Sequence, residues 1–235
     1  MPDPIETPIN PLPPAVWLLA LPIIGVEVVL SLADNQMVGG PQSLGWRSLV
    51  IQNLAFAPDY LRQMLTVGQY PLNGLWRPFT YPLINGSAGQ NLFVVVILMA
   101  IGKYVGQVFA SWAILLIFFA SAAIGAFAYT AIPETHSALI GGFPGVYGLI
   151  GAFSFLLWVK LAGTGTNRLQ AFQLIGFLLG VRVLFGSVTL YFYGADQGAG
   201  WQWVAELGGF ACGFLMSFVV SPGGWTRVLT KLRST

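Results

Sequence analysis

Three ionisable side chains lie inside apolar stretches, where charges are unusual. Glu27, Arg182 and Glu206 are each flanked by aliphatic and aromatic residues. A carboxylate in such surroundings can act as a general base, pair with a guanidinium or join a proton relay. A charge at the centre of a membrane helix costs about 2.5–3.5 kcal/mol, so each group must face protein or water. The sequence allows a pair between Arg182 and either acid, or three separate groups.

Other arrangements of reactive residues are sparse. The one histidine, His136, is followed by Ser137. Adjacent residues do not readily adopt nucleophile–base geometry, and no acid is evidently placed to orient them, so we predict a solvated or interfacial His136. One histidine and one cysteine, Cys212, cannot form a zinc cluster, and no Gly-rich loop with a lysine for phosphate is present. We therefore expect no metal and no cofactor.

The composition is that of a membrane protein with several spans. Of the residues, 56% are hydrophobic and 8% are charged, too few charges to cover a water-facing surface. The net charge of +2, with scattered basic residues, argues against a nucleic-acid partner. The six predicted spans are Ala15–Ala33, Asn91–Phe109, Trp112–Thr130, Gly145–Val159, Leu169–Tyr191 and Trp203–Val220. The fourth of these apolar stretches is short, which suits a helix that starts below the membrane surface.

The predicted organisation is a Pro-rich cytoplasmic tail (1–14), a membrane domain (15–220) and a basic cytoplasmic tail (221–235). The long loop 34–90 contains two amphipathic patterns, around 46–56 and 60–67, which predict short helices in the membrane interface rather than a soluble loop. Basic residues are more numerous on the side of the termini, which places both termini in the cytoplasm. On that side are Lys103, Lys160, Arg168, Arg227, Lys231 and Arg233, and on the other are Arg47, Arg62 and Arg77.

Three segments, in this order, resemble the signatures of rhomboid intramembrane serine proteases. They are Leu75–Tyr81 with its Trp76-Arg77 pair, Gly142–Gly151, and Ala205–Gly213. The resemblance implies an all-α bundle of six transmembrane helices, with a half-embedded first loop in which the Arg ties backbone carbonyls together. It also implies close helix packing through small residues. The glycines concerned are Gly209 and Gly213 of the last span and, as a facing surface, Gly145, Gly148 and Gly151 of the fourth.

The residues that carry rhomboid chemistry are replaced. The Gly-x-Ser-Gly motif of the family reads Gly142-Phe143-Pro144-Gly145 here, and either Phe143 or Pro144 stands at the serine. The histidine base becomes Glu206, and the oxyanion-stabilising His and Asn become Gln90 and Val94. A hydroxyl needs a neighbouring base to attack a carbonyl, so the resemblance implies a pseudoprotease without the Ser nucleophile and the His base.

Such a frame is expected to bind transmembrane helices of client proteins, for retention, escort or assembly, with membrane lipid around it. Glu206 could receive a client Lys, Arg or polar backbone group, or could hydrogen-bond within the protein. Alternative functions are an accessory subunit of a larger membrane complex, a hydrolase with an unrecognised nucleophile, and a transporter that uses Glu27, Arg182 and Glu206 as a relay. The six-span core and simple tails favour a bacterial inner membrane.

Overall fold

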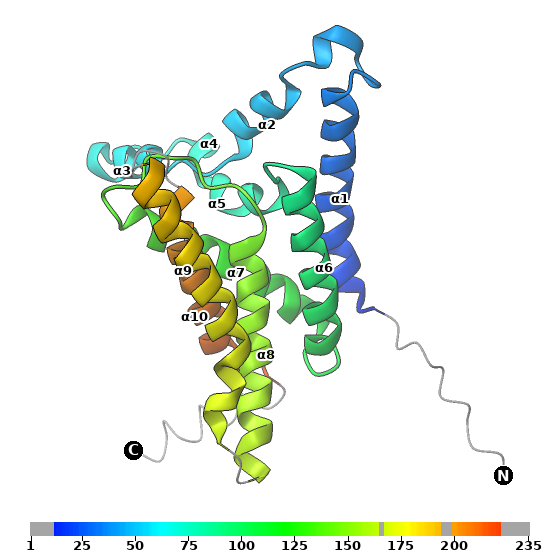
Figure 1. Ribbon diagram of the computed structural model, residues 1–235, viewed down its shortest axis with the longest axis vertical. Coiled ribbons are helices and arrows are strands. Elements are labelled where there is room, and N and C mark those ends of the chain that lie inside the picture. The colour runs from blue at the N-terminus through cyan, green and yellow to red at the C-terminus, as the bar shows by residue number, and fades with distance from the viewer. Residues whose placement is uncertain (1–11, 165–166, 194–198, 222–235) are drawn as a thin grey trace, which may run out of the picture.

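The computed structural model describes residues 12–164, 167–193 and 199–221 and is a bundle of helices (Figure 1). Residues 1–11 and 222–235 lie outside the described residues, and with them most of the predicted Pro-rich tail and the basic tail. Within the described ranges the chain forms helices and no strand, apart from one isolated antiparallel bridge between Phe56 and Leu139. The predicted all-α class is confirmed.

Within the part of the chain that the structure describes, six helices are long and apolar enough to cross a membrane, which confirms the predicted number of spans. The protein is therefore an integral membrane protein. An even number of spans places the start of the first and the end of the last on the same side. The spanning helices are α1 (Pro14–Asp34), α6 (Ala88–Val105), α7 (Ser111–Thr130), α8 (Phe143–Thr164), α9 (Gln173–Tyr193) and α10 (Gln202–Val220).

The fourth span is not short. Helix α8 has 22 residues, so the prediction of a short helix over Gly145–Val159 is wrong. The helix begins two residues earlier, at Phe143, and continues past Lys160 to Thr164. A lysine can continue an apolar helix because its aliphatic stem packs along the helix while its ammonium group reaches water.

Two other predicted spans are shifted. Helix α6 begins at Ala88 because the Ser87 hydroxyl accepts a hydrogen bond from the Gln90 amide at 3.3 Å and caps the helix. The fifth span starts as a 3₁₀ helix, η3 (Arg168–Phe172), and becomes α-helical at Gln173. These differences reflect hydrogen bonding at the ends, which an apolar run does not define.

The loop between the first two spans is folded into short helices at one end of the bundle (Figure 1). Helices α2 (Trp46–Leu54) and α3 (Pro58–Val67) correspond to the two predicted amphipathic segments. The sequence did not predict α4, α5 and two 3₁₀ helices, because three or four residues are too few to show a period. Their bounds are Leu72–Leu75 for α4, Arg77–Thr80 for α5, Gly40–Ser43 for η1 and Tyr81–Leu83 for η2.

Helix α8 lies at the centre of the bundle and α9 at its edge. Helix α8 packs against α6, α7 and α10, and 56% of its spanning segment is buried. In contrast, 17% of the α9 span is buried, and its neighbours are α10, η3 and η5 (Ala199–Trp201). The central helix is therefore a rigid platform for the residues at its end, while α9 is held along one side only.

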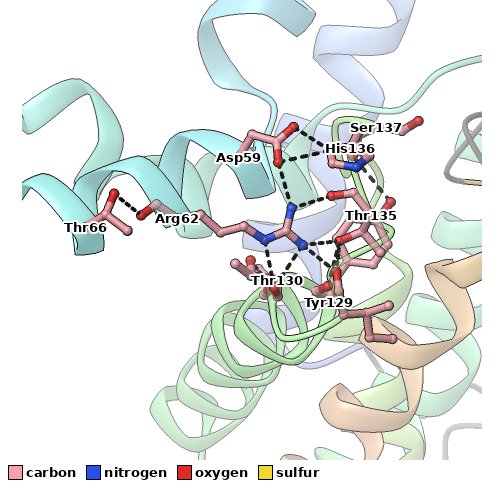
Figure 2. A network of polar contacts seen from close by, with 10 residues as sticks. Asp59, Arg62, Thr66, Tyr129, Thr130, Thr135, His136 and Ser137 are labelled. Carbon is pink, nitrogen blue, oxygen red and sulfur yellow. Dashed lines mark hydrogen bonds and ion pairs between the residues drawn. The ribbon is translucent and has the colours of Figure 1, made fainter.

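Arg62 of α3 attaches the first loop to the end of α7 (Figure 2). Its guanidinium donates to the carbonyl of Thr130 at 3.0 and 3.2 Å, to the carbonyl of Thr135 at 2.7 Å, and to that of Ile132. The last carbonyls of a helix lack partners within the helix, and the negative end of the helix dipole favours a cation there. Nothing in the local sequence around Arg62 indicated this contact.

Asp59 connects the same network to His136 (Figure 2). Its carboxylate lies 2.7 Å from Nη1 of Arg62 and 3.0 Å from Nδ1 of His136. The expectation that no acid orients His136 is therefore wrong, because Asp59 comes from a distant part of the chain. His136 is solvated as predicted, with 60% of its side chain exposed.

We expect this contact between the two loops to weaken in acid. Burial raises the pKa of Asp59, but hydrogen bonds from His136 and Arg62 outweigh it and hold the pKa below the ordinary 3.8. A carboxyl whose pKa is lowered by folding stabilises the fold above about pH 3.8 and loses that effect as pH falls through the folded value. Amide exchange of residues 133–140, corrected for its intrinsic pH dependence, should show protection at about pH 5 that is lost near pH 3. Asp59→Asn should not show this pH-dependent loss of amide protection. If the variant lost protection over the same pH range as the unmodified protein, the role of Asp59 would be contradicted.

Candidate functional site

Residues of three helices meet at the start of α8. Phe143 and Pro144 are the first two residues of α8, and Glu206 lies early in α10. Arg182 of α9 reaches between them: its guanidinium carbon is 4.9 Å from the centre of the Phe143 ring, within range of a cation–π contact, and the guanidinium also pairs with Glu206. Three separately predicted residues thus form one cluster.

Glu206 is fully engaged by its neighbours. Only 1% of the residue is exposed, and Nε of Arg182 lies 2.8 and 3.0 Å from its two carboxylate oxygens. Nη2 of Arg182 makes a further hydrogen bond to the same carboxylate. A forked guanidinium is the partner best matched to a buried carboxylate. The structure therefore assigns Arg182 to Glu206 rather than to Glu27, and the carboxylate lies in an ion pair.

Gln90 and Val94 of α6 lie beside the turn that leads into α8. A Cβ atom added to Gly141 would be 2.4 Å from Nε2 of Gln90, and one added to Gly142 would be 2.8 Å from Cγ1 of Val94. Gly141 also has a φ of +105°, which favours glycine. The Gln90 side-chain oxygen accepts a hydrogen bond from the Gly86 amide at 3.1 Å. Gln90 and Val94, which the resemblance aligns with the oxyanion-stabilising His and Asn, thus adjoin the turn that precedes α8.

Helices α8 and α10 touch backbone to backbone. A Cβ atom on Gly209 would lie 2.2 Å from the carbonyl oxygen of Pro144, and one on Gly213 would lie 1.9 Å from that of Gly148. The two glycines therefore form the predicted close-packing face. Gly145 is not part of the facing surface, because its missing Cβ would meet the Phe118 ring of α7 at 2.7 Å. The missing Cβ of Gly148 also points to α7, where it would lie 2.1 Å from Oγ of Ser121, and Gly148 contacts α10 through its carbonyl oxygen. The error arose because spacing along one helix does not identify the neighbour of each face.

The facing surface on α8 also includes Gly151, whose added Cβ would lie 2.3 Å from the carbonyl oxygen of Phe210. Pro144 itself suits the first turn of a helix, where a backbone N–H has no partner within the helix. The start of α8 is therefore fixed both locally, by its proline, and by contact with α10.

Arg77 ties backbone carbonyls of the first loop together. It donates to the carbonyl of Asn73 at 3.1 Å, that of Ala55 at 3.0 Å and that of Gln52 at 3.0 Å. Its guanidinium also lies over the Tyr60 ring, 5.4 Å from the centroid. Trp76, the other member of the pair, is about half exposed on the loop, at 49%. Three of the five donors of one side chain therefore hold the loop together.

Replacing Arg77 by Lys should loosen the loop. An ammonium group presents three donors from one point and cannot reach three separated carbonyls as the planar fork does. We expect a loss of about 1.5–3 kcal/mol of local stability, the usual value of hydrogen bonds to a charged group. Hydrogen exchange of the α2 amides, compared with that of α10, would measure it. Arg168→Lys, on the far side of the bundle, is the control and should leave the loop unchanged; equal protection in both variants would contradict the role of Arg77.

Comparison with known proteins identifies the family of this chain. The family model described as "Rhomboid domain" matches residues 72–223, which is more than half of the chain. The chain belongs to the rhomboid family. The matched region starts just before the Trp76-Arg77 pair and extends to the end of α10, so it includes every rhomboid position discussed above.

One relative of this rhomboid covers almost the whole chain. It is the "Inactive rhomboid-related protein 2" of Caenorhabditis elegans, 26% identical over 221 residues. The alignment includes 90% of this chain and 56% of the relative. The chain therefore spans about half the length of that protein.

This rhomboid has another ion-pair cluster, separate from the Arg182–Glu206 pair. Glu27 of α1 is buried and lies 2.9 Å from Nη2 of Arg47, whose Nε is 2.8 Å from Asp34. The hydrogen bond between Arg47 and Glu27 raises the pKa of Arg47, although burial opposes the shift. The three residues of the predicted relay thus belong to two charge clusters with different partners, Glu27 to one and Arg182 with Glu206 to the other. Among residues 12–164, 167–193 and 199–221, no three His, Cys, Asp or Glu side chains are placed to hold a metal ion.

Proposed function

We propose that this rhomboid does not cleave peptide bonds and instead binds transmembrane helices of client proteins. The observation that supports this most is the Arg182–Glu206 ion pair at the position of the family's catalytic base. The aligned nucleophile position, whether Phe143 or Pro144, has no hydroxyl to attack a carbonyl. The name of the inactive relative is consistent with the same loss.

The outer face of α9 is the best candidate for client contact. Four exposed apolar residues follow one stripe of this helix, with exposed fractions of 37–69%: Phe177, Val181, Leu184 and Val188. Helices in a membrane associate through van der Waals packing and hydrogen bonds, because lipid tails are as apolar as the side chains. A client Lys or Arg would reach Glu206 only by displacing Arg182, so packing on α9 comes first.

We further propose that both termini are cytoplasmic and that the protein resides in a bacterial inner membrane. Lys103 and Lys160 lie near the ends of α6 and α8 that face away from the long first loop. The excess of positive charge on that side depends on Arg227, Lys231 and Arg233, which follow α10 within the distance that the positive-inside rule counts. The six-span core supports the bacterial assignment.

Capture of clients from membranes would test the proposal. Protein purified in a mild detergent should bring along several membrane proteins in less than equal amounts. The double variant Phe177→Ala with Leu184→Ala should recover severalfold less of them. The matched control is Leu18→Ala with Leu21→Ala on α1, where the side chains are similarly exposed, at 61% and 58%.

Other outcomes would replace the proposal with an alternative. Equal amounts of one complex in every preparation would indicate an accessory subunit. Labelling by a fluorophosphonate probe would indicate a hydrolase, and solute flux in proteoliposomes that is lost on changing Arg182 would indicate a transporter. Equal client recovery in the α9 and α1 variants would remove α9 as the binding face.

A further inference from the structure

A groove between α1 and α6 has no role in the function proposed above. Its volume is about 470 Å³, and it lies beside the Glu27 cluster rather than the Arg182–Glu206 pair. Its walls are mostly apolar, with Ile24, Val28 and Leu32 on α1 and Leu92 and Val95 on α6. Three polar side chains, Glu27, Ser31 and Asn91, also line it. Val28 and Leu92 are exposed at its mouth, by 50% and 63%, so the groove opens on the face that meets lipid.

The dimensions of the groove fit a hydrocarbon chain better than a helix. Ile24 and Leu32 are eight residues apart on α1, which is about 12 Å at 1.5 Å per residue. One leaflet of a membrane has a hydrocarbon depth of about 15 Å, half of the full core. About one turn of a helix of about 10 Å diameter would already fill the volume of the groove, so the groove is too small for a longer helix. The groove therefore matches the length of a lipid chain in the leaflet on the side of the long loop.

Charged and polar groups extend from the wall of the groove, at Glu27, toward the end of α1, at Asp34. Ser31 donates to Glu27 at 2.9 Å, and Arg47 bridges Glu27 and Asp34. One guanidinium and two carboxylates leave this cluster with one unbalanced negative charge. Asp34 is its most accessible member, with 42% of its side chain exposed, and it lies at the end of α1. A cationic group is the natural complement at that point.

Arg47 has one donor left for a second ligand group. Among contacts of the described residues, its hydrogen bonds go to Asp34, twice to Glu27, and to the carbonyl of Asn85. A guanidinium has five N–H groups, so one remains, and 18% of the side chain is exposed. A phosphate oxygen is a suitable acceptor for it.

We propose that this groove binds one zwitterionic phospholipid with a primary ammonium, of the phosphatidylethanolamine class. An acyl chain lies between Val28 and Leu92, the ammonium reaches Asp34, and the phosphate accepts from Arg47. Apolar contact alone gives little preference, because the surrounding lipid is equally apolar. The headgroup therefore supplies the selectivity and the groove supplies the position.

The test uses the whole chain in bilayer nanodiscs of equal parts phosphatidylethanolamine, phosphatidylglycerol and phosphatidylcholine with identical acyl chains. Native mass spectrometry of the released protein should show one retained phosphatidylethanolamine, preferred about fivefold, which corresponds to about 1 kcal/mol. Val28→Phe should reduce retention by a similar factor. Val29→Phe is the matched control, since Val29 is 48% exposed on the same helix but does not line the groove, and should retain the lipid.

Asp34→Asn tests the headgroup separately and should abolish the preference for phosphatidylethanolamine without emptying the groove. Equal retention in the Val28 and Val29 variants, or equal retention of all three lipids by the unmodified protein, would overturn the proposal. A dimer that Val28→Phe dissociates would also overturn it, because the groove would then hold a second copy. None of these outcomes depends on client binding, so the proposed function can fail independently.

Discussion

Gly213→Ala should be among the most damaging single changes in this protein. The added Cβ would lie 1.9 Å from the carbonyl oxygen of Gly148, and the next two atoms it meets are also backbone, at 2.5 and 2.6 Å. No side-chain rotation relieves such a contact, so α8 and α10 must separate. We expect a loss of about 3 kcal/mol or more, at the upper end of overpacking effects. Equilibrium unfolding in mixed micelles, monitored by steric trapping, would measure this loss of stability.

Gly180→Ala is the matched control for that experiment. Gly180 is also inside a spanning helix, α9, but a Cβ added there has nothing within 4 Å. Alanine is the better helix former by about 0.8–1.0 kcal/mol, so this variant should be neutral or slightly more stable. If both variants lost similar stability, backbone contact between α8 and α10 would not be what joins the two helices.

Arg182→Met should cause a comparable loss by stranding a buried charge. Glu206 has 2% of its side chain exposed, and Arg182 is its only cationic contact among the described residues. Removing one member of a buried pair typically costs about 3–5 kcal/mol, because the other charge remains desolvated without compensation. The same unfolding measurement applies, with α9 amide exchange as a local readout.

The double variant Arg182→Met with Glu206→Met distinguishes a structural ion pair from a general loss of packing. Replacing both members of a buried pair by apolar residues is often neutral or stabilising by about 1–4 kcal/mol. We therefore expect the double variant to recover most of the stability that Arg182→Met loses. Arg168→Met, at an arginine that lies over the Trp158 ring, should change stability by about 1 kcal/mol or less. A double variant as unstable as the single one would show that the pair does not act as a unit.

The spanning helices and the family signatures could be predicted from the sequence because both depend on local patterns. Long apolar runs identify the six spans, and the Trp76-Arg77 pair with the downstream glycines identifies the rhomboid frame. The ends of the helices were less accurate. They depend on caps such as Ser87, which the hydropathy of a run does not reveal. Lys160 lowers the hydropathy and ended the predicted run, but its long stem lets the helix continue.

The partners of the charged residues could not be predicted in the same way. Glu27 meets Arg47, 20 residues away, and Asp59 meets His136, 77 residues away. Each contact links two elements whose separation in sequence says nothing about their separation in space. The face that Gly145 presents to Phe118 was missed for the same reason.

The sequence by itself determined that this is a six-span membrane protein of the rhomboid family, and the resemblance aligns Phe143 or Pro144 with the nucleophile and Glu206 with the base. Residue identity alone decides whether a hydroxyl or an imidazole is available for chemistry. Only the tertiary structure decided that Arg182 neutralises Glu206 and that a lipid-facing groove adjoins the Glu27 cluster. The energy of a buried charge depends on what lies within a few ångströms of it, and the packing of distant helices determines those neighbours.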